Sequence, residues 1–102
     1  MSRAVMEYNR KVPEITQKAL RSLGNREELA IAILLSEKGE VSFKQLANLI
    51  QMNPGTLNYH LKPLRRAGLV ENHYKKVESS DEYSFYQLSE FGKDFLKLVM
   101  AT

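Results

Sequence analysis

The sequence predicts a mainly α-helical fold that carries a small β-hairpin. Apolar residues recur at helical spacing in several segments. Each segment begins or ends at a capping residue, a proline or a glycine. After a glycine stop at Gly68 come two segments rich in strand-forming residues, with a polar stretch of hairpin length between them. A chain of 102 residues is long enough for one hydrophobic core, so we expect a single domain over residues 1–102.

Two helices are predicted in the first third of the chain. Residues 12–23 carry apolar side chains at helical spacing, and Gly24 ends the segment. Asn25, with Glu28 three residues later, resembles a capping box for a helix over residues 26–38. This second helix is apolar nearly all round, so it must be buried on more than one side. It is therefore either a central core helix or part of a subunit interface.

Two shorter helices separated by a tight turn are predicted next. Ser42, with a glutamine three residues later, caps a helix that runs to Gln51. The pair Asn53-Pro54 is typical of a helix cap followed by proline in the first turn, and the helix that it starts runs to residue 67. A helix, a tight turn and a second helix in this order are typical of a helix-turn-helix.

The last third of the chain predicts a hairpin and a final helix. Residues 69–77 and 83–88 are expected to be strands, and the loop between them carries acidic residues (Glu78, Asp81 and Glu82). Ser89 caps a last helix over residues 89–101. The whole order is that of a winged helix-turn-helix with additional N- and C-terminal helices.

The helix over residues 54–67 presents two different faces. At 100° per residue, Leu57, Leu61 and Leu64 fall within about 40° of one another and are expected to face the core. The opposite side mixes hydrogen-bonding groups that can read base edges with cations suited to phosphate. His60 falls beside the leucine stripe, which favours a packed, hydrogen-bonded histidine over a DNA or metal contact. The expected DNA-binding residues are Lys44, Asn53, Gly55, Thr56, Asn58, Tyr59, Lys62, Arg66, Lys75 and Lys76.

The distribution of charge also favours a DNA-binding protein. The net charge is +3, but residues 41–77 contain six basic residues and one acidic residue, which gives this segment a net charge of +5 and leaves −2 for the rest. A basic middle within a slightly acidic frame suits one face for a polyanion. The alternative is a chance cluster of solvated lysines.

Several classes of function are not expected. The absence of cysteine excludes disulfides, thiolate metal sites and a cysteine nucleophile. There is no glycine-rich phosphate loop, and the two histidines lack a recognisable catalytic constellation, so we expect no enzyme, no cofactor and no metal. The longest apolar run, residues 29–35, is too short for a membrane span, and residues 1–10 lack the apolar centre of a signal peptide. We therefore expect a cytoplasmic protein.

The segment from Asn53 to Leu64, followed by Ala67-Gly68-Leu69-Val70, resembles the recognition helix and strand entry of ArsR-like winged-helix transcription regulators. The segment from Tyr86 to Lys93 is similar to the second wing strand in MarR-like and archaeal winged-helix proteins. The resemblance implies a homodimer on a pseudo-palindromic operator, most often a repressor, with the recognition helix in the major groove. It also implies that the terminal helices, residues 12–23 and 89–101, dimerise. Their candidate interface residues, together with the apolar central helix, are Ile15, Ala19, Leu23, Ile31, Leu35, Phe95 and Val99.

The sequence departs from the family pattern at three points. Asn58 stands where many relatives carry serine, a change that keeps hydrogen-bonding ability. The chain lacks the metal-sensing cysteines of ArsR repressors, so metal sensing is not expected. The acidic loop would repel phosphates, so we expect the wing to contact DNA marginally, or only through Lys75 and Lys76 at its base. Two alternatives stay open, a winged-helix protein–protein interaction module and a nonspecific DNA- or chromatin-associated protein. Nothing in the sequence identifies a small-molecule effector.

Overall fold

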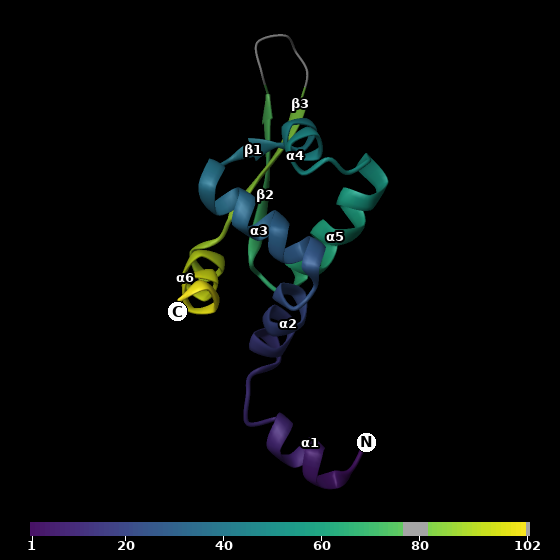
Figure 1. The fold of residues 1–102 in the computed structure, drawn as a ribbon, viewed down its shortest axis with the longest axis vertical. Helices are drawn as coiled ribbons and strands as arrows, with labels where there is room; N and C mark the ends of the chain where they lie inside the picture. The colour runs from purple at the N-terminus through teal and green to yellow at the C-terminus, as the bar shows by residue number, and fades with distance from the viewer. Residues whose placement is uncertain (77–81, 102) are drawn as a thin grey trace.

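The computed structural model describes residues 1–76 and 82–101, and it confirms the predicted fold class (Figure 1). The described residues form six helices and a small three-stranded antiparallel sheet. The elements in chain order are α1 (Arg3–Asn9), α2 (Glu14–Leu23), α3 (Arg26–Lys38), β1 (Val41–Ser42), α4 (Phe43–Ile50), α5 (Pro54–Arg66), β2 (Val70–Lys76), β3 (Glu82–Leu88) and α6 (Glu90–Met100). The acidic loop predicted at the wing tip lies mostly outside the described residues.

The sheet has the strand order β1-β3-β2. β2 and β3 form the predicted hairpin, with Val70 opposite Leu88 at its base. β1 was not predicted, because it is only two residues long and is defined by its pairing with β3, in which Val41 lies opposite Tyr86. This pairing connects the start of α4 to the β2–β3 hairpin, which is the wing of the fold.

α3 is the central helix of the domain. It contacts α2, α4, α5, α6 and β3, and Ile31 and Leu35 on it are almost completely buried. Ala19 and Leu23 on α2 are buried against the same core. The prediction that these four residues belong to a dimer interface is therefore wrong, because their side chains are already covered within one chain. Of the open alternatives for the apolar helix, the structure favours the core helix.

The N-terminal helix α1 projects from the body of the molecule (Figure 1). It was not predicted, and none of its residues is buried. The link to α2 includes two hydrogen bonds from the Gln17 side-chain amide, which donates to the carbonyl oxygens of Asn9 and Val12 at 2.9 and 2.8 Å. α2 begins at Glu14, later than predicted, because Pro13 is its cap.

The last helix, α6, packs very closely on the start of the wing. Ser89 caps it as predicted by accepting a hydrogen bond from the Gly92 amide, and the Ser89 hydroxyl also donates to the Gly68 carbonyl. A Cβ added to Gly92 would lie 2.1 Å from the Leu69 carbonyl oxygen, so only glycine allows this approach. Gly68 itself has φ +71°, a left-handed conformation that lets the chain turn from α5 into β2.

Candidate nucleic-acid interface

The helix-turn-helix is built from local signals that the sequence carries. Ser42 and Gln45 form a complete capping box at the start of α4. Gln51 ends that helix in a left-handed conformation with φ 61°, which turns the chain sharply toward α5. Asn53 then caps α5, because its Oδ1 accepts a hydrogen bond from the Thr56 amide at 2.8 Å. The predicted cap and turn between the two helices are confirmed.

The two faces of α5 are separated as the sequence predicts. Leu57, Leu61 and Leu64 have no exposed surface and form part of the core. The opposite side is open to solvent, and Tyr59 is 70% exposed there. The exposed predicted contacts on or next to this helix are Asn53, Gly55, Thr56, Asn58, Tyr59, Lys62 and Arg66. A Cβ on Gly55 would meet only the Asn53 side chain, at 3.4 Å, so packing does not require glycine at this position.

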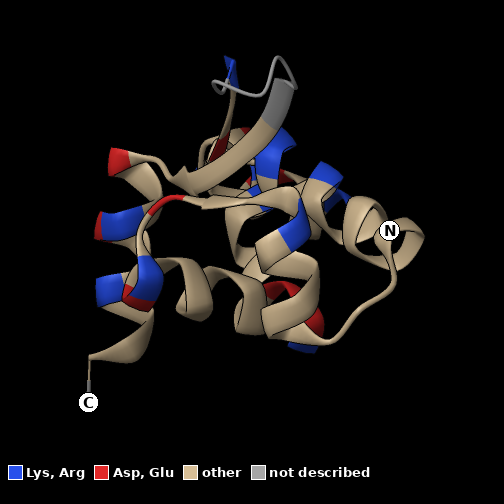
Figure 2. Cartoon of the chain, turned by 90° about the horizontal axis from the view of Figure 1, so that it is seen from above, with Lys and Arg blue, Asp and Glu red and all other residues tan. Residues whose placement is uncertain are grey.

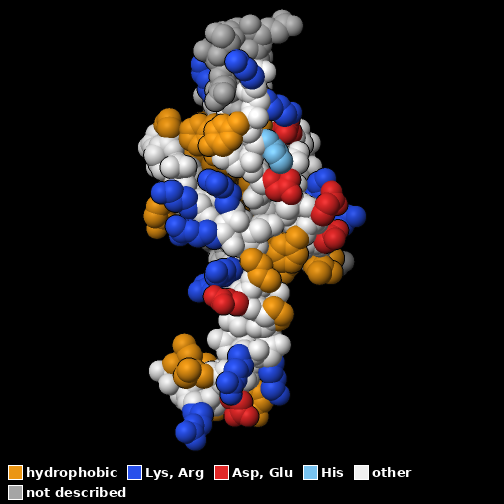
Figure 3. Space-filling model, turned by 180° about the vertical axis from the view of Figure 1, so that it is seen from behind, with side chains coloured by type: hydrophobic (Ala, Val, Ile, Leu, Met, Phe, Trp, Pro, Cys, Tyr) orange, Lys and Arg blue, Asp and Glu red, His pale blue; other side chains and the backbone are white. Residues whose placement is uncertain are grey.

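The C-terminal half of α5 is strongly basic. Lys62, Arg65 and Arg66 line a shallow cavity of about 440 Å³ together with Val70. Seen from behind, lysine and arginine side chains gather on the side of the molecule where α5 lies (Figure 3). In contrast, α6 mixes acidic and basic residues along its length (Figure 2). Arg65 was not among the predicted contacts, although its place in the last turn beside Arg66 was a usable signal.

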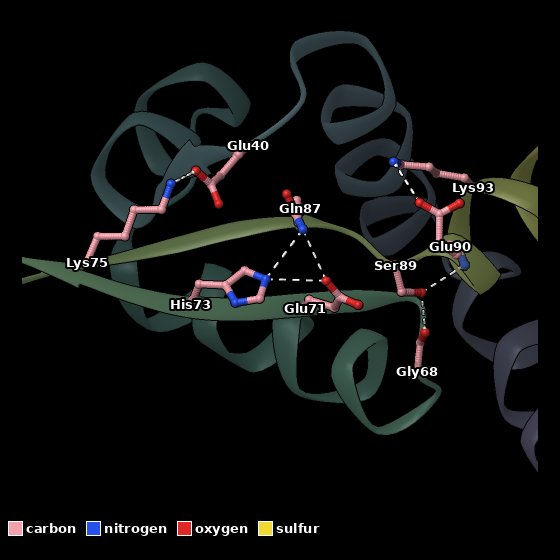
Figure 4. A network of polar contacts seen from close by, with 10 residues as sticks. Glu40, Gly68, Glu71, His73, Lys75, Gln87, Ser89, Glu90 and Lys93 are labelled. Carbon is pink, nitrogen blue, oxygen red and sulfur yellow. Dashed lines mark hydrogen bonds and ion pairs between the residues drawn. The ribbon is translucent and has the colours of Figure 1, made fainter.

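The three predicted lysine contacts on other elements differ in whether their charge is already paired. Lys44 on α4 and Lys76 at the end of β2 are exposed. Lys75 instead forms an ion pair with Glu40, and its ammonium lies 5.1 Å from the centre of the Phe85 ring (Figure 4). The Glu40 carboxylate partly neutralises this lysine, so Lys75 offers less charge to a phosphate than Lys76 does.

A polar cluster on the exposed side of the wing involves Glu71, His73 and Gln87 (Figure 4). The Gln87 amide donates to Glu71 Oε2 at 3.1 Å, and His73 Nε2 lies 3.3 Å from the same oxygen. The hydrogen bond from Gln87, and then that from His73, lowers the pKa of Glu71 below its ordinary value. The carboxylate is therefore held in its charged form on the wing surface.

His60 is the packed histidine that the sequence favours. It is 8% exposed, and its Nδ1 lies 3.0 Å from Glu28 Oε2. The other oxygen of Glu28 accepts a hydrogen bond from the Ser22 hydroxyl at 2.9 Å. The predicted capping box at Asn25 is therefore only half formed: Asn25 accepts from the Glu28 amide, but the Glu28 side chain points to Ser22 and His60 instead of back to the cap.

Two negative findings apply to the described part of the chain. Residues 1–76 and 82–101 contain no group of three histidine, cysteine, aspartate or glutamate side chains placed to hold a metal ion. In the same residues, no helix is both long and apolar enough to cross a membrane.

The chain matches known regulators in sequence and in structure. Residues 29–72 match the model of the bacterial regulatory proteins of the arsR family. This segment runs from α3 into β2 and so contains the whole helix-turn-helix. No protein with curated annotation matches the chain significantly.

Solved structures are similar to this chain over a longer stretch than the family model covers. A transcriptional regulator homologue from Pyrococcus horikoshii OT3 is similar with a TM-score of 0.72 and 27% identity, over 79% of each chain. HlyU from Vibrio cholerae N16961 is similar with a TM-score of 0.64 and 28% identity, over 86% of this chain and 94% of HlyU.

A third structure supports the fold alone. It is a homodimeric winged helix-turn-helix DNA-binding domain from Mycobacterium bovis, a possible ArsR-family regulator, with a TM-score of 0.72 and 23% identity over 97% of this chain and 83% of that one. The family match and the structural relatives agree with the resemblance seen in the sequence: the chain has a winged helix-turn-helix fold, and its helix-turn-helix segment is similar to bacterial regulatory proteins of the arsR family.

Proposed function

We propose that this protein binds double-stranded DNA sequence-specifically and represses transcription, with α5 lying in the major groove. The observation that carries the proposal is the division of α5 into a buried leucine face and an exposed face. The exposed face carries Asn58 and Tyr59 beside the cation Lys62. An amide and a phenol can read base edges, and a lysine can bind phosphate. Repression is the role that the family resemblance implies.

We also propose that the protein acts as a homodimer. Three of the candidate interface residues are available for a partner: Ile15 and Val99 are 44% and 45% exposed, and Phe95 is half-buried. α6 also exposes the apolar side chains of Leu98 and Met100, and covering them with a partner would be favourable. The related domain from Mycobacterium bovis is described as homodimeric, which supports the same arrangement. The interface is expected on the outer surfaces of α2 and α6.

The remaining expectations join this proposal. Residues 1–102 act as one DNA-binding domain in the cytoplasm, without a cofactor or metal. The DNA contacts are those predicted from the sequence, with Arg65 added and Lys75 given a smaller share because of its ion pair with Glu40.

Selection of bound duplexes from a random DNA pool, with the mass of the complex measured, tests the proposal. We expect enrichment of a pseudo-palindrome whose half-sites lie about one helical turn apart, with two chains on each duplex. Binding without sequence preference would favour a nonspecific DNA-associated protein. Absence of binding at low salt would favour a protein–protein interaction module. A reporter gene carrying the selected site near its promoter then tests repression, because expression should rise when the protein is absent.

A further inference from the structure

Three side chains from three helices meet beneath the recognition helix. Ser22 is in the last turn of α2, Glu28 is in the first turn of α3, and His60 is in the middle of α5. All three are less than 9% exposed. The Glu28 carboxylate lies between the other two, with one oxygen 2.9 Å from the Ser22 hydroxyl and the other 3.0 Å from His60 Nδ1. The carboxylate therefore links α2 to the recognition helix.

Neither the cap nor the hydrophobic core accounts for this carboxylate. The backbone amide of Asn25, which a capping-box glutamate would bind, already donates to the Ser22 carbonyl oxygen at 3.0 Å. A carboxylate is also costly to bury, and an apolar side chain of similar size would fill the same space without that cost. The cost is offset because both of its oxygens have partners. What an apolar residue would not supply is a directional contact to His60.

The contact continues from His60 to the surface that is proposed to read DNA. The rings of Tyr59 and His60 lie 5.2 Å apart between centroids and are nearly perpendicular, at 81°. This edge-to-face arrangement is a favourable one for aromatic rings. Tyr59 is 70% exposed, so few other contacts restrict its ring. A fixed His60 ring therefore limits the orientations of the Tyr59 ring.

We propose that Glu28 is a positioning residue for DNA recognition: its buried carboxylate fixes His60, and through His60 it orients Tyr59 relative to α2. The proposal rests on the proposed function, because it assigns the orientation of Tyr59 a role in sequence readout. It concerns the sequence-dependent part of binding. The phosphate contacts of Lys62 and its neighbours do not pass through this network.

The test compares two substitutions at residue 28. Glu28→Leu replaces the carboxylate with an apolar side chain of similar size and removes both hydrogen bonds. Glu28→Gln provides an amide oxygen and an amide nitrogen that can hydrogen-bond to Ser22 and His60. This variant should therefore retain most of the affinity for the operator. The matched control is Glu71→Leu, which removes the exposed glutamate partner of His73 at 3.3 Å. Circular dichroism and thermal unfolding establish that each variant is folded at the assay temperature.

The first readout is affinity for the selected operator and for random duplex. Glu28→Leu should weaken operator binding by about tenfold, as expected for the loss of a charge-assisted hydrogen bond, and should leave random-duplex binding nearly unchanged. In a Tyr59→Ala background the same substitution should have little further effect, because the ring that it orients is gone. An equal loss on both DNAs, or additive effects of the two substitutions, would overturn the proposal.

The second readout needs no DNA and separates this proposal from the proposed function. In free Glu28→Leu protein, hydrogen exchange at the α5 amides around Tyr59 and His60 should be faster than in wild-type protein. In Glu28→Gln the exchange rates of these amides should return to near the wild-type values. Glu71→Leu should leave the α5 amides unchanged. If wild-type protein shows no sequence preference, the proposed function fails and exchange alone decides the structural link. Unchanged exchange at α5 in folded Glu28→Leu would refute that link.

Discussion

Lys62→Ala should make DNA binding measurably less sensitive to salt. Each lysine or arginine that neutralises a phosphate contributes about −0.9 to the slope of log K against log salt concentration. Five predicted contacts per protomer are cationic, but Lys75 is already paired with Glu40. The remaining four, together with Arg65, give a dimer a slope of about −9. These five cations are Lys44, Lys62, Arg65, Arg66 and Lys76.

The substitution removes one such contact from each protomer, so the slope should become shallower by about 1.8. Between 50 and 200 mM salt, the affinity of the variant should therefore fall about tenfold less than that of wild-type protein. Among the side chains that the structure describes, no ion pair holds Lys62, so its full charge is available.

Fluorescence anisotropy with a labelled random duplex at five or six salt concentrations measures both slopes. Lys75→Ala is the matched control, because Glu40 already neutralises this lysine. Its slope should change by less than half as much as that of Lys62→Ala. If Lys62→Ala has the wild-type slope, then Lys62 does not meet a phosphate and the proposed docking of α5 is wrong. If Lys75→Ala has the larger effect, the wing carries the contact instead.

Three further predictions follow from single contacts in the structure. Tyr59→Ala should weaken operator binding by about 1–3 kcal/mol and leave the salt slope unchanged, and an unaltered operator affinity in gel-shift titration would exclude Tyr59 as a base contact. Gly92→Ala should lower the free energy of unfolding by about 1–3 kcal/mol, because its Cβ would lie 2.1 Å from the Leu69 carbonyl oxygen; an unchanged urea midpoint would contradict this. Gln87→Ala should raise the pKa of Glu71 toward its ordinary value in an NMR titration, because the largest cause of its lowering is removed. Since folding lowers this pKa, its stabilisation is present above the ordinary value and is lost as the pH falls through the lowered one.

The sequence predicted most of the elements that depend on local signals. The caps at Ser42, Asn53 and Ser89 involve residues within three positions of one another, so a short stretch of sequence contains the whole interaction. β1 could not be found in this way, because Val41 becomes a strand residue only by pairing with Tyr86. α1 has a cap at Ser2 but no buried face, so it lacked the periodic pattern that marks the other helices.

The candidate site was predicted less completely, for the same reason. Exposure of the α5 face follows from its periodicity, which the leucine stripe made visible. The role of Glu28 does not follow from its neighbours in sequence, because its carboxylate binds a residue 32 positions away. The sequence instead favoured its nearest apparent use, a capping box with Asn25. The local pattern correctly predicted that Asn25 caps the helix, but it predicted the wrong hydrogen-bond partner for the Glu28 side chain.

The errors in the predicted dimer interface have a different origin. Apolar composition marks a residue for burial but does not distinguish the core of one chain from a contact between two. Of the candidate interface residues, those that are exposed in one chain remain available for the proposed interface. A Cβ added to Gly68 would touch Ile15 of α2 and Phe91 of α6, at 3.9 and 4.0 Å, so both helices approach the point where α5 turns into the wing. A partner that covers Ile15 would therefore contact α2, the helix that carries Ser22. Since Ser22 binds Glu28, the proposed dimer contact and the proposed positioning of the recognition helix both involve α2.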